Sequence, residues 1–186
     1  IHTVPWPMTP LEELPEEDLS LIRLHATDSI ETKPLNWNQF SDSSNEHYLA
    51  VSSDATRKAL PVLLSEWVRY KRASRRRFAL ILKLSTFDCG KSDESRLNEC
   101  HRLFRFACFP RATPHLDLFV IVDDLPETSM ARLYSSCRGL LSASAGEGFG
   151  GPVAEAALLG KIVVAPRHTS LQELLPEGYP LIPLHE

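Results

Sequence analysis

The sequence predicts an α/β fold built on a doubly wound parallel sheet. Short apolar runs with the length of buried strands alternate with segments whose apolar residues recur at helical spacing. Strands that alternate with helices are joined by right-handed crossovers, which give a parallel sheet covered by helices on both faces. A third observation is a glycine-rich turn between an apolar run and a helix start, the place where such sheets bind ligands.

The predicted strands are short apolar runs. They occupy residues 47–52, 78–84, 116–122, 139–143, 161–165 and 181–184. Ligands of parallel sheets bind at the carboxyl ends of the strands. We therefore expect the turns after residues 52, 122 and 143 to converge on one crevice.

The predicted helices fall between these runs. They occupy residues 57–72, 95–108, 127–137, 152–159 and 170–175. In the first of them, Leu60, Leu64 and Val68 recur at helical spacing and form one apolar stripe. Thr169 and Gln172 have the spacing of a capping box that opens the last one.

Composition divides the chain into two parts. Residues 1–46 are rich in proline, carry an acidic cluster at 12–18 and show little periodicity, so we expect an extended segment there. Residues 47–186 have the periodicity of one compact domain. Because the chain begins at Ile1 without a signal-peptide pattern, we expect a processed product or a piece of a longer protein.

Overall composition narrows the class of protein. The hydrophobic fraction of 43% is ample for a core, and no apolar run is long enough to span a bilayer. A net charge of -4 gives no general attraction to nucleic acid. The 4 cysteines lack CxxC spacing, which favours free thiols in a reducing, cytoplasmic compartment. The histidines show no ligand spacing, so we expect no metal site.

Residues 146–156, with the sequence GEGFGGPVAEA, join the glycine-rich turn to a helix start. Glycines leave the backbone free to approach a ligand, and a helix that begins near Pro152 directs unpaired N–H groups at the same spot, which suits a diphosphate. Glu147 would repel a phosphate, so we expect its side chain to reach hydroxyl groups of the ligand. Glu155, one turn into the helix, can accept hydrogen bonds from a ribose diol.

This stretch resembles the signature of GT-B glycosyltransferases, particularly retaining enzymes of family four. Their C-terminal domain carries Glu, Gly, Phe, Gly, a variable residue, Pro and a second Glu, and segments 125–134 and 160–175 of this chain are similar to the family's flanking elements. The resemblance is strong from about 116 to 183 and is not detectable before 47. It implies a Rossmann-like domain, the C-terminal half of a GT-B fold. The implied activity is hexosyltransferase-like, with transfer from a nucleoside-diphosphate sugar and retention.

The resemblance also implies roles for single residues. Glu147 would hold the donor sugar, and Lys58 and Arg57 would hold the diphosphate, so these three are the candidate catalytic residues. The remaining donor contacts would come from Gly148, Phe149, Gly150, Gly151, Val153, Glu155 and Val122. The base would rest against the turn after Val122. The chain departs from the family at the first strand end, where Ser52 and Ser53 replace a Gly-Arg pair.

Partners follow from the same resemblance. The chain would bind a nucleotide sugar without a metal or other cofactor, and the acceptor would be a glycan, lipid or protein. The acceptor-binding N-terminal domain would be a separate domain or chain, and residues 1–46 would lead from it into a donor domain, 47–186, that ends early. The basic run 69–77 would allow a peripheral contact with an anionic membrane, or would be a solvated helix end.

Other interpretations of these residues stay open. The glycine turn could be an ordinary strand–helix connection, Arg57 and Lys58 a solvated helix start, and the two glutamates a turn residue and a helix-dipole charge. A non-catalytic interaction domain with the same fold would carry the same pattern. The glycines also satisfy G-x-G-x-x-G, so an NADP-binding module is a further alternative, although that fingerprint usually opens its domain.

Overall fold

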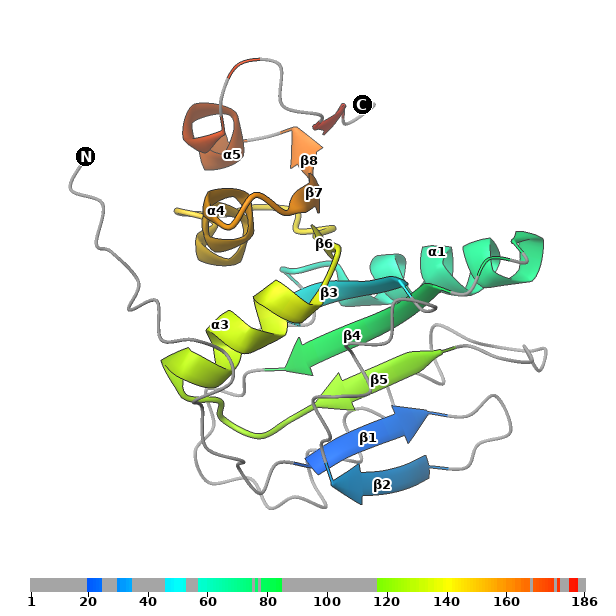
Figure 1. Cartoon of the computed structure of the whole chain (residues 1–186). Helices are drawn as coiled ribbons and strands as arrows, with labels where there is room; N and C mark the ends of the chain where they lie inside the picture. Colours follow the sequence, from blue (N-terminus) through cyan, green and yellow to red (C-terminus); the bar gives the residue numbers. More distant parts are fainter. Residues whose placement is uncertain are drawn as a thin grey trace.

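A seven-stranded sheet runs through the molecule (Figure 1). The structure is a computed structural model and describes residues 20–24, 30–34, 46–52, 57–74, 76, 78–84, 117–167, 169–175, 177 and 181–183. In spatial order the strands are β2 (Ile30–Pro34), β1 (Ser20–Leu24), β5 (Leu118–Ile121), β4 (Phe78–Leu84), β3 (Glu46–Ser52), β6 (Gly139–Leu141) and β7 (Ile162–Val164). From β5 to β7 all neighbours are parallel. The predicted α/β fold with a parallel sheet is confirmed.

The parallel strands arise from the predicted apolar runs. The runs at 47–52, 78–84, 116–122, 139–143 and 161–165 are confirmed as β3, β4, β5, β6 and β7. In β4 every residue from Ala79 to Lys83 is buried, as expected for a strand covered on both faces. The run at 181–184 instead forms β9 (Ile182–Pro183), which pairs with the unpredicted β8 (Pro166–Arg167) in a separate small sheet.

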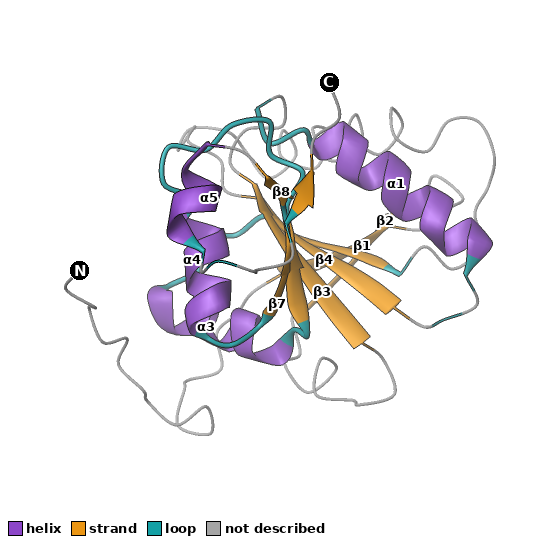
Figure 2. Cartoon of the chain, turned by 90° about the horizontal axis from the view of Figure 1, so that it is seen from above, coloured by secondary structure: helices purple, strands orange, loops and turns teal. Residues whose placement is uncertain are grey.

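Helices cover both faces of the sheet (Figure 2). One face carries α1 (Leu60–Ala73), and the other carries α3 (Glu127–Ser136), α4 (Gly151–Leu158) and α5 (Thr169–Leu174). These four correspond to predicted helices, whereas the helix predicted at 95–108 lies outside the described residues. Within the part of the chain that the structure describes, no helix is long and apolar enough to cross a membrane.

The first helix begins later than predicted. It starts at Leu60 rather than Arg57, because Ala59 adopts the left-handed conformation (φ 48°, ψ 37°) and interrupts the helical backbone. The prediction that Arg57 and Lys58 open this helix is therefore wrong. Both residues lie in the turn that precedes it.

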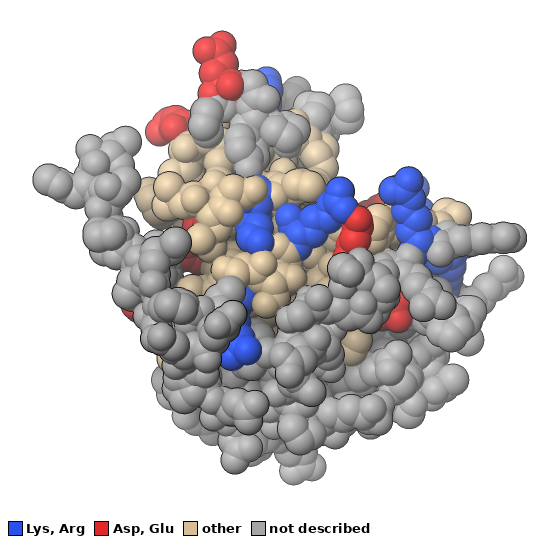
Figure 3. Space-filling model, in the orientation of Figure 1, with Lys and Arg blue, Asp and Glu red and all other residues tan. Residues whose placement is uncertain are grey.

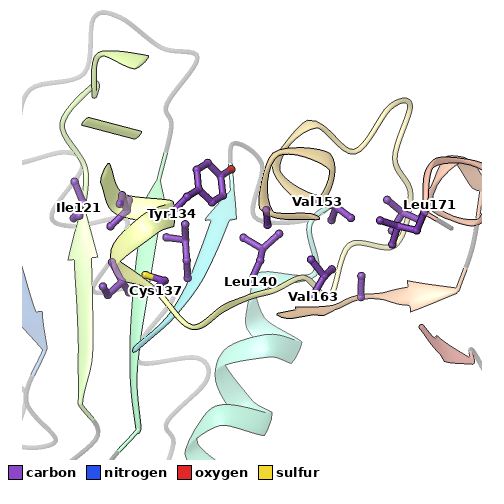
Figure 4. Close-up of a cluster of buried hydrophobic side chains, with 13 residues drawn as sticks. Ile121, Tyr134, Cys137, Leu140, Val153, Val163 and Leu171 are labelled. Atoms are coloured by element: carbon purple, nitrogen blue, oxygen red, sulfur yellow. The ribbon is translucent and has the colours of Figure 1, made fainter. Parts of the chain in front are cut away.

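The hydrophobic core forms one layer on each face of the sheet. Leu49 and Ile81 pack with Val153 and Leu171 in the layer beneath α3, α4 and α5 (Figure 4). On the opposite face the predicted stripe of α1 is confirmed, since its buried residues are Leu60, Leu64, Trp67 and Val68. Each fully buried leucine contributes about 1.5–3 kcal/mol relative to an exposed one. The two layers hold the strand ends, and the turns that follow them, in place.

Two strands lie within the segment expected to be extended. β1 and β2 form an antiparallel hairpin, and β1 pairs with β5 in the register Ile22↔Val120. The hairpin therefore extends the edge of the sheet, which the sequence did not predict. The interdomain role expected for residues 1–46 stays a prediction.

Candidate functional site

The turn after β6 and the turn before α1 meet at the carboxyl end of the parallel sheet. The Ala145 N–H donates to the carbonyl oxygen of Arg57 (N···O 3.0 Å), which joins the two turns through their backbones. In Figure 3, basic side chains gather on the surface between α4 and α1. The predicted convergence is thereby confirmed for the turn before α1 and the turn after β6, and for the turn after residue 122 it stays a prediction.

Two cations of the first turn bind the acidic residue of the second. Lys58 Nζ donates a hydrogen bond to Glu147 Oε1 and forms an ion pair with it. Arg57 Nη1 lies 3.3 Å from Glu147 Oε2 and donates to the carbonyl oxygen of Gly146 at 2.8 Å. The structure thus brings together all three residues predicted to be catalytic. We call Arg57, Lys58 and Glu147 the charged cluster.

The Glu147 carboxylate is buried and nevertheless ionised. Its side chain is only 7% exposed, and burial by itself raises the pKa of a carboxyl group. Hydrogen bonds from Lys58 and Ser144, together with the charges of Lys58 and Arg57, outweigh that burial and lower the pKa of Glu147. Because two cations face one carboxylate, the charged cluster stays positive overall. This removes the repulsion between Glu147 and an anionic ligand that the sequence alone suggested.

Two serines support the backbone around Glu147. Ser144 is 1% exposed, and its single hydroxyl hydrogen is shared between the Glu147 carboxylate and the carbonyl oxygen of Gly146, which lies 3.1 Å from the hydroxyl oxygen. The Ser170 hydroxyl, from α5, donates to the carbonyl oxygen of Glu147 (3.2 Å). The turn is therefore held from β6 on one side and from α5 on the other.

Gly150 shapes the junction between the turn and α4. It adopts φ 76°, a left-handed conformation, and a Cβ atom there would lie 2.6 Å from Leu171 Cδ2. Its carbonyl oxygen accepts the first helical hydrogen bonds, from the N–H groups of Val153 and Ala154. No side chain caps α4 among the described residues. Pro152 has no N–H group and the Val153 N–H already donates to Gly150, so the Gly151 N–H is the donor that the first turn of α4 offers to an anion.

Glu155 reaches back toward the start of α4. Its Oε1 atom lies 4.0 Å from the position that a Cβ atom on Gly151 would occupy, in agreement with the tilt of helical side chains toward the N-terminus. The phenol of Tyr134, on α3, lies beside this carboxylate. Glu155 can therefore accept hydrogen bonds from a ligand seated at the helix start.

The other predicted site residues differ in exposure. Gly148 and Phe149 are exposed in the turn, and Phe149 is 68% exposed. Val122 and Val153 are buried and belong to the core layers, and the Val153 N–H already donates to Gly150. The ligand contacts of these residues stay predictions. Among the described residues, no group of three or more His, Cys, Asp or Glu could hold a metal ion.

Sequence reasoning missed Ser144, Ser170 and Tyr134. Ser144 directly follows a predicted strand at its ligand-binding end, so its polar side chain was a usable signal. Ser170 and Tyr134 lie within helices, and their relation to Glu147 and Glu155 depends on how those helices pack. No local pattern indicates it.

Comparisons by sequence find no relative. No protein-family model matches this chain, and no curated protein matches it.

Solved glycosyltransferase structures share the fold. The C-terminal domain of a glycosyl transferase group 1 family protein (LpcC) from Francisella tularensis matches with TM-score 0.53 and 12% identity over 80% of this chain and 73% of that one. A UDP-forming alpha,alpha-trehalose-phosphate synthase from Burkholderia xenovorans, in complex with glucose-6-phosphate, matches with TM-score 0.54 and 17% identity over 75% of this chain. A GtfA/B complex matches with TM-score 0.53 and 21% identity over 76% of it.

These matches establish architecture only. The chain covers 33% of the trehalose-phosphate synthase chain and 25% of the GtfA/B chain. At such identities the likeness shows the fold alone, which is the Rossmann-like α/β domain of GT-B glycosyltransferases. The predicted fold is confirmed in this form.

Proposed function

We propose that this chain is the donor-binding part of a GT-B glycosyltransferase of the retaining, family-four-like kind. It binds a nucleoside-diphosphate sugar and transfers the sugar, a hexose, to a glycan, lipid or protein acceptor. The observation that carries the proposal is the charged cluster of Arg57, Lys58 and Glu147 beside the uncapped start of α4. It combines groups for a diphosphate with a carboxylate for hydroxyl groups.

The cations and the helix start would act on the diphosphate. As the bond to the sugar breaks, negative charge grows on the departing diphosphate, and fixed positive groups stabilise it without any proton transfer to the leaving group. Lys58 has three N–H donors, so it can keep its hydrogen bond to Glu147 and still donate to phosphate oxygens. The Gly151 N–H at the start of α4 adds a donor to the same anion.

The two glutamates would bind different parts of the donor. Glu147 is held between the cations and Ser144, so its carboxylate is oriented before any ligand arrives. We assign it to hydroxyl groups of the transferred sugar. Glu155 reaches the start of α4 from within that helix, and we assign it to the ribose diol. The base then lies toward Val122.

The acceptor side is assigned to a separate domain or chain. Support comes from the neighbours' own descriptions, one a C-terminal domain and one a complex, and from the small share of the larger chains that this fold covers. We place the chain in the cytoplasm, with a peripheral membrane contact through Arg72 at the end of α1 and Arg76 just after the helix.

Calorimetric titration of the chain with UDP, GDP and NADP tests the proposal. We expect UDP or GDP to bind more tightly than NADP. Tighter binding of NADP would make the proposed function wrong. If none of the three binds, the proposed function loses its support, and the alternative of a non-catalytic domain with the same fold is favoured.

A further inference from the structure

The phenol of Tyr134 is buried without a hydrogen bond of good geometry to any described residue. The residue is 2% exposed, and within the described part of the chain its hydroxyl has no hydrogen-bond partner at normal geometry. Leaving a buried hydroxyl unpaired costs about 1–3 kcal/mol. Such a group needs an explanation, because nearly all buried polar atoms in folded proteins are paired.

The polar group beside this hydroxyl is the carboxylate of Glu155. Tyr134 on α3 and Val153 on α4 belong to the same core layer, which packs the two helices together. In Figure 4 the Tyr134 oxygen points toward the α4 ribbon that carries Val153. Burial raises the pKa of Tyr134, and so do the close approach of its hydroxyl to the Glu155 carboxylate and the charge of that carboxylate. The phenol therefore keeps its proton and can act only as a neutral donor to Glu155.

We propose that Tyr134 is a positioning residue that fixes the Glu155 carboxylate for a vicinal diol. A carboxylate has two oxygens and accepts several hydrogen bonds. When a diol occupies one oxygen, the other turns to accept the Tyr134 hydroxyl, which then gains its missing partner. The assignment rests on the proposed function, since the diol is the ribose of a nucleotide bound at the start of α4.

The arrangement favours a ligand-linked role over a structural one. A hydroxyl that only stabilised the fold would make a hydrogen bond of good geometry in the ligand-free chain, whereas this one lies beside Glu155 without reaching that geometry. Removing it should therefore leave the folded state intact and lower affinity only for ligands that engage Glu155. Tyr48, a partly buried tyrosine that packs edge-on against Phe78 on β4, offers a matched control.

The test is a double-mutant cycle read by calorimetry with two ligands, UDP and 2′,3′-dideoxy-UDP. Tyr134→Phe should weaken UDP binding by roughly two- to tenfold, the range for one net hydrogen bond. The loss should vanish in a Glu155→Ala background and should be absent for the dideoxy ligand. Tyr48→Phe should bind UDP like the wild type, and thermal unfolding of ligand-free Tyr134→Phe should be unchanged or occur at a higher temperature.

Two results overturn the inference, and they are distinguishable. In the first, UDP binds to the wild type and Glu155→Ala lowers the affinity, but Tyr134→Phe binds UDP normally or loses the same factor of affinity for both ligands. The positioning role is then wrong while the proposed function stands. If the wild-type chain binds no nucleotide, the proposed function fails and the inference fails with it.

Discussion

Lys58 and Glu147 form an ion pair across 89 positions of sequence, between the turn before α1 and the turn after β6. The pair explains how a turn suited to anions carries a glutamate, because the cations neutralise that charge before a ligand binds. It also places a donor for phosphate and an acceptor for hydroxyl groups within one hydrogen bond of each other. The proposed ligand, a nucleoside-diphosphate sugar, would use both the phosphate donor and the hydroxyl acceptor.

Lys58→Ala should weaken UDP binding by about 1.5–3 kcal/mol, the range for a hydrogen bond that involves a charged group. The reason is the loss of an ammonium donor whose side chain is 11% exposed and already fixed in the site. Calorimetry measures the change. Arg69→Ala removes an 80% exposed cation from α1 and should leave affinity unchanged. Equal affinities for wild type and Lys58→Ala would return Lys58 to the role of a solvated charge.

Glu147 should make the fold sensitive to acid. The pKa of Glu147 is lower in the folded chain than in the unfolded chain, where a glutamate has a pKa of about 4.3. The stabilisation from its ion pairs is therefore complete above that ordinary pKa and is lost as pH falls through the lower, folded value. Urea unfolding between neutral and acid pH should show a steeper loss for wild type than for Glu147→Gln. Glu173→Gln, on the exposed side of α5, should follow the wild type. If the free energy of unfolding falls with pH equally steeply in Glu147→Gln and in the wild type, the predicted acid sensitivity is wrong.

Gly150→Ala should destabilise the chain by about 1–2 kcal/mol from the left-handed backbone alone. The added methyl group would also lie 2.6 Å from Leu171 Cδ2, and the displacement of that buried side chain would increase the loss. Gly148→Ala is the matched control, since no atom lies within 4 Å of its Cβ position. Denaturant unfolding of both variants measures the difference. A Gly148→Ala variant as unstable as Gly150→Ala would show that the turn has a different shape.

Ala59→Gly should stabilise the chain by up to about 1.6 kcal/mol. The left-handed conformation costs a non-glycine residue about 1–2 kcal/mol, and glycine offsets part of the gain through its freer unfolded state, by about 0.4–1 kcal/mol. Ala131→Gly, inside α3, should instead destabilise by about 0.5–1 kcal/mol. Both are read from denaturant unfolding. A loss of stability in Ala59→Gly would mean that its Cβ atom contributes packing that exceeds the strain.

The sequence predicted the parts of this structure whose signals are local. The bounds of β4 were predicted correctly, because a strand buried on both faces is a nearly continuous apolar run, which Lys83 alone interrupts here. Glu147 and Lys58 were expected at one crevice, because strand ends of a parallel sheet meet at one edge. Their direct ion pair was not predicted, since it depends on the fold of two turns. The left-handed Ala59 was missed because alanine carries no signal for that conformation. The hairpin of β1 and β2 was missed because the pairing of β1 with β5, which places it in the sheet, is a tertiary relation.

The central claim is that Glu147 binds the sugar of the donor while Glu155 binds the ribose, and ligand truncation tests it most directly. UDP and UDP-glucose, and GDP and GDP-mannose, would be titrated against wild type, Glu147→Gln and Glu155→Gln. Glu155→Gln should weaken the binding of the nucleoside diphosphate and of the sugar nucleotide by the same amount. Glu147→Gln should leave the binding of the nucleoside diphosphate unchanged. It should weaken the binding of the sugar nucleotide by about 1–3 kcal/mol, the cost of an unpaired buried polar group. Equal losses for both ligands in Glu147→Gln would contradict the claim and leave the carboxylate as a support for its own turn.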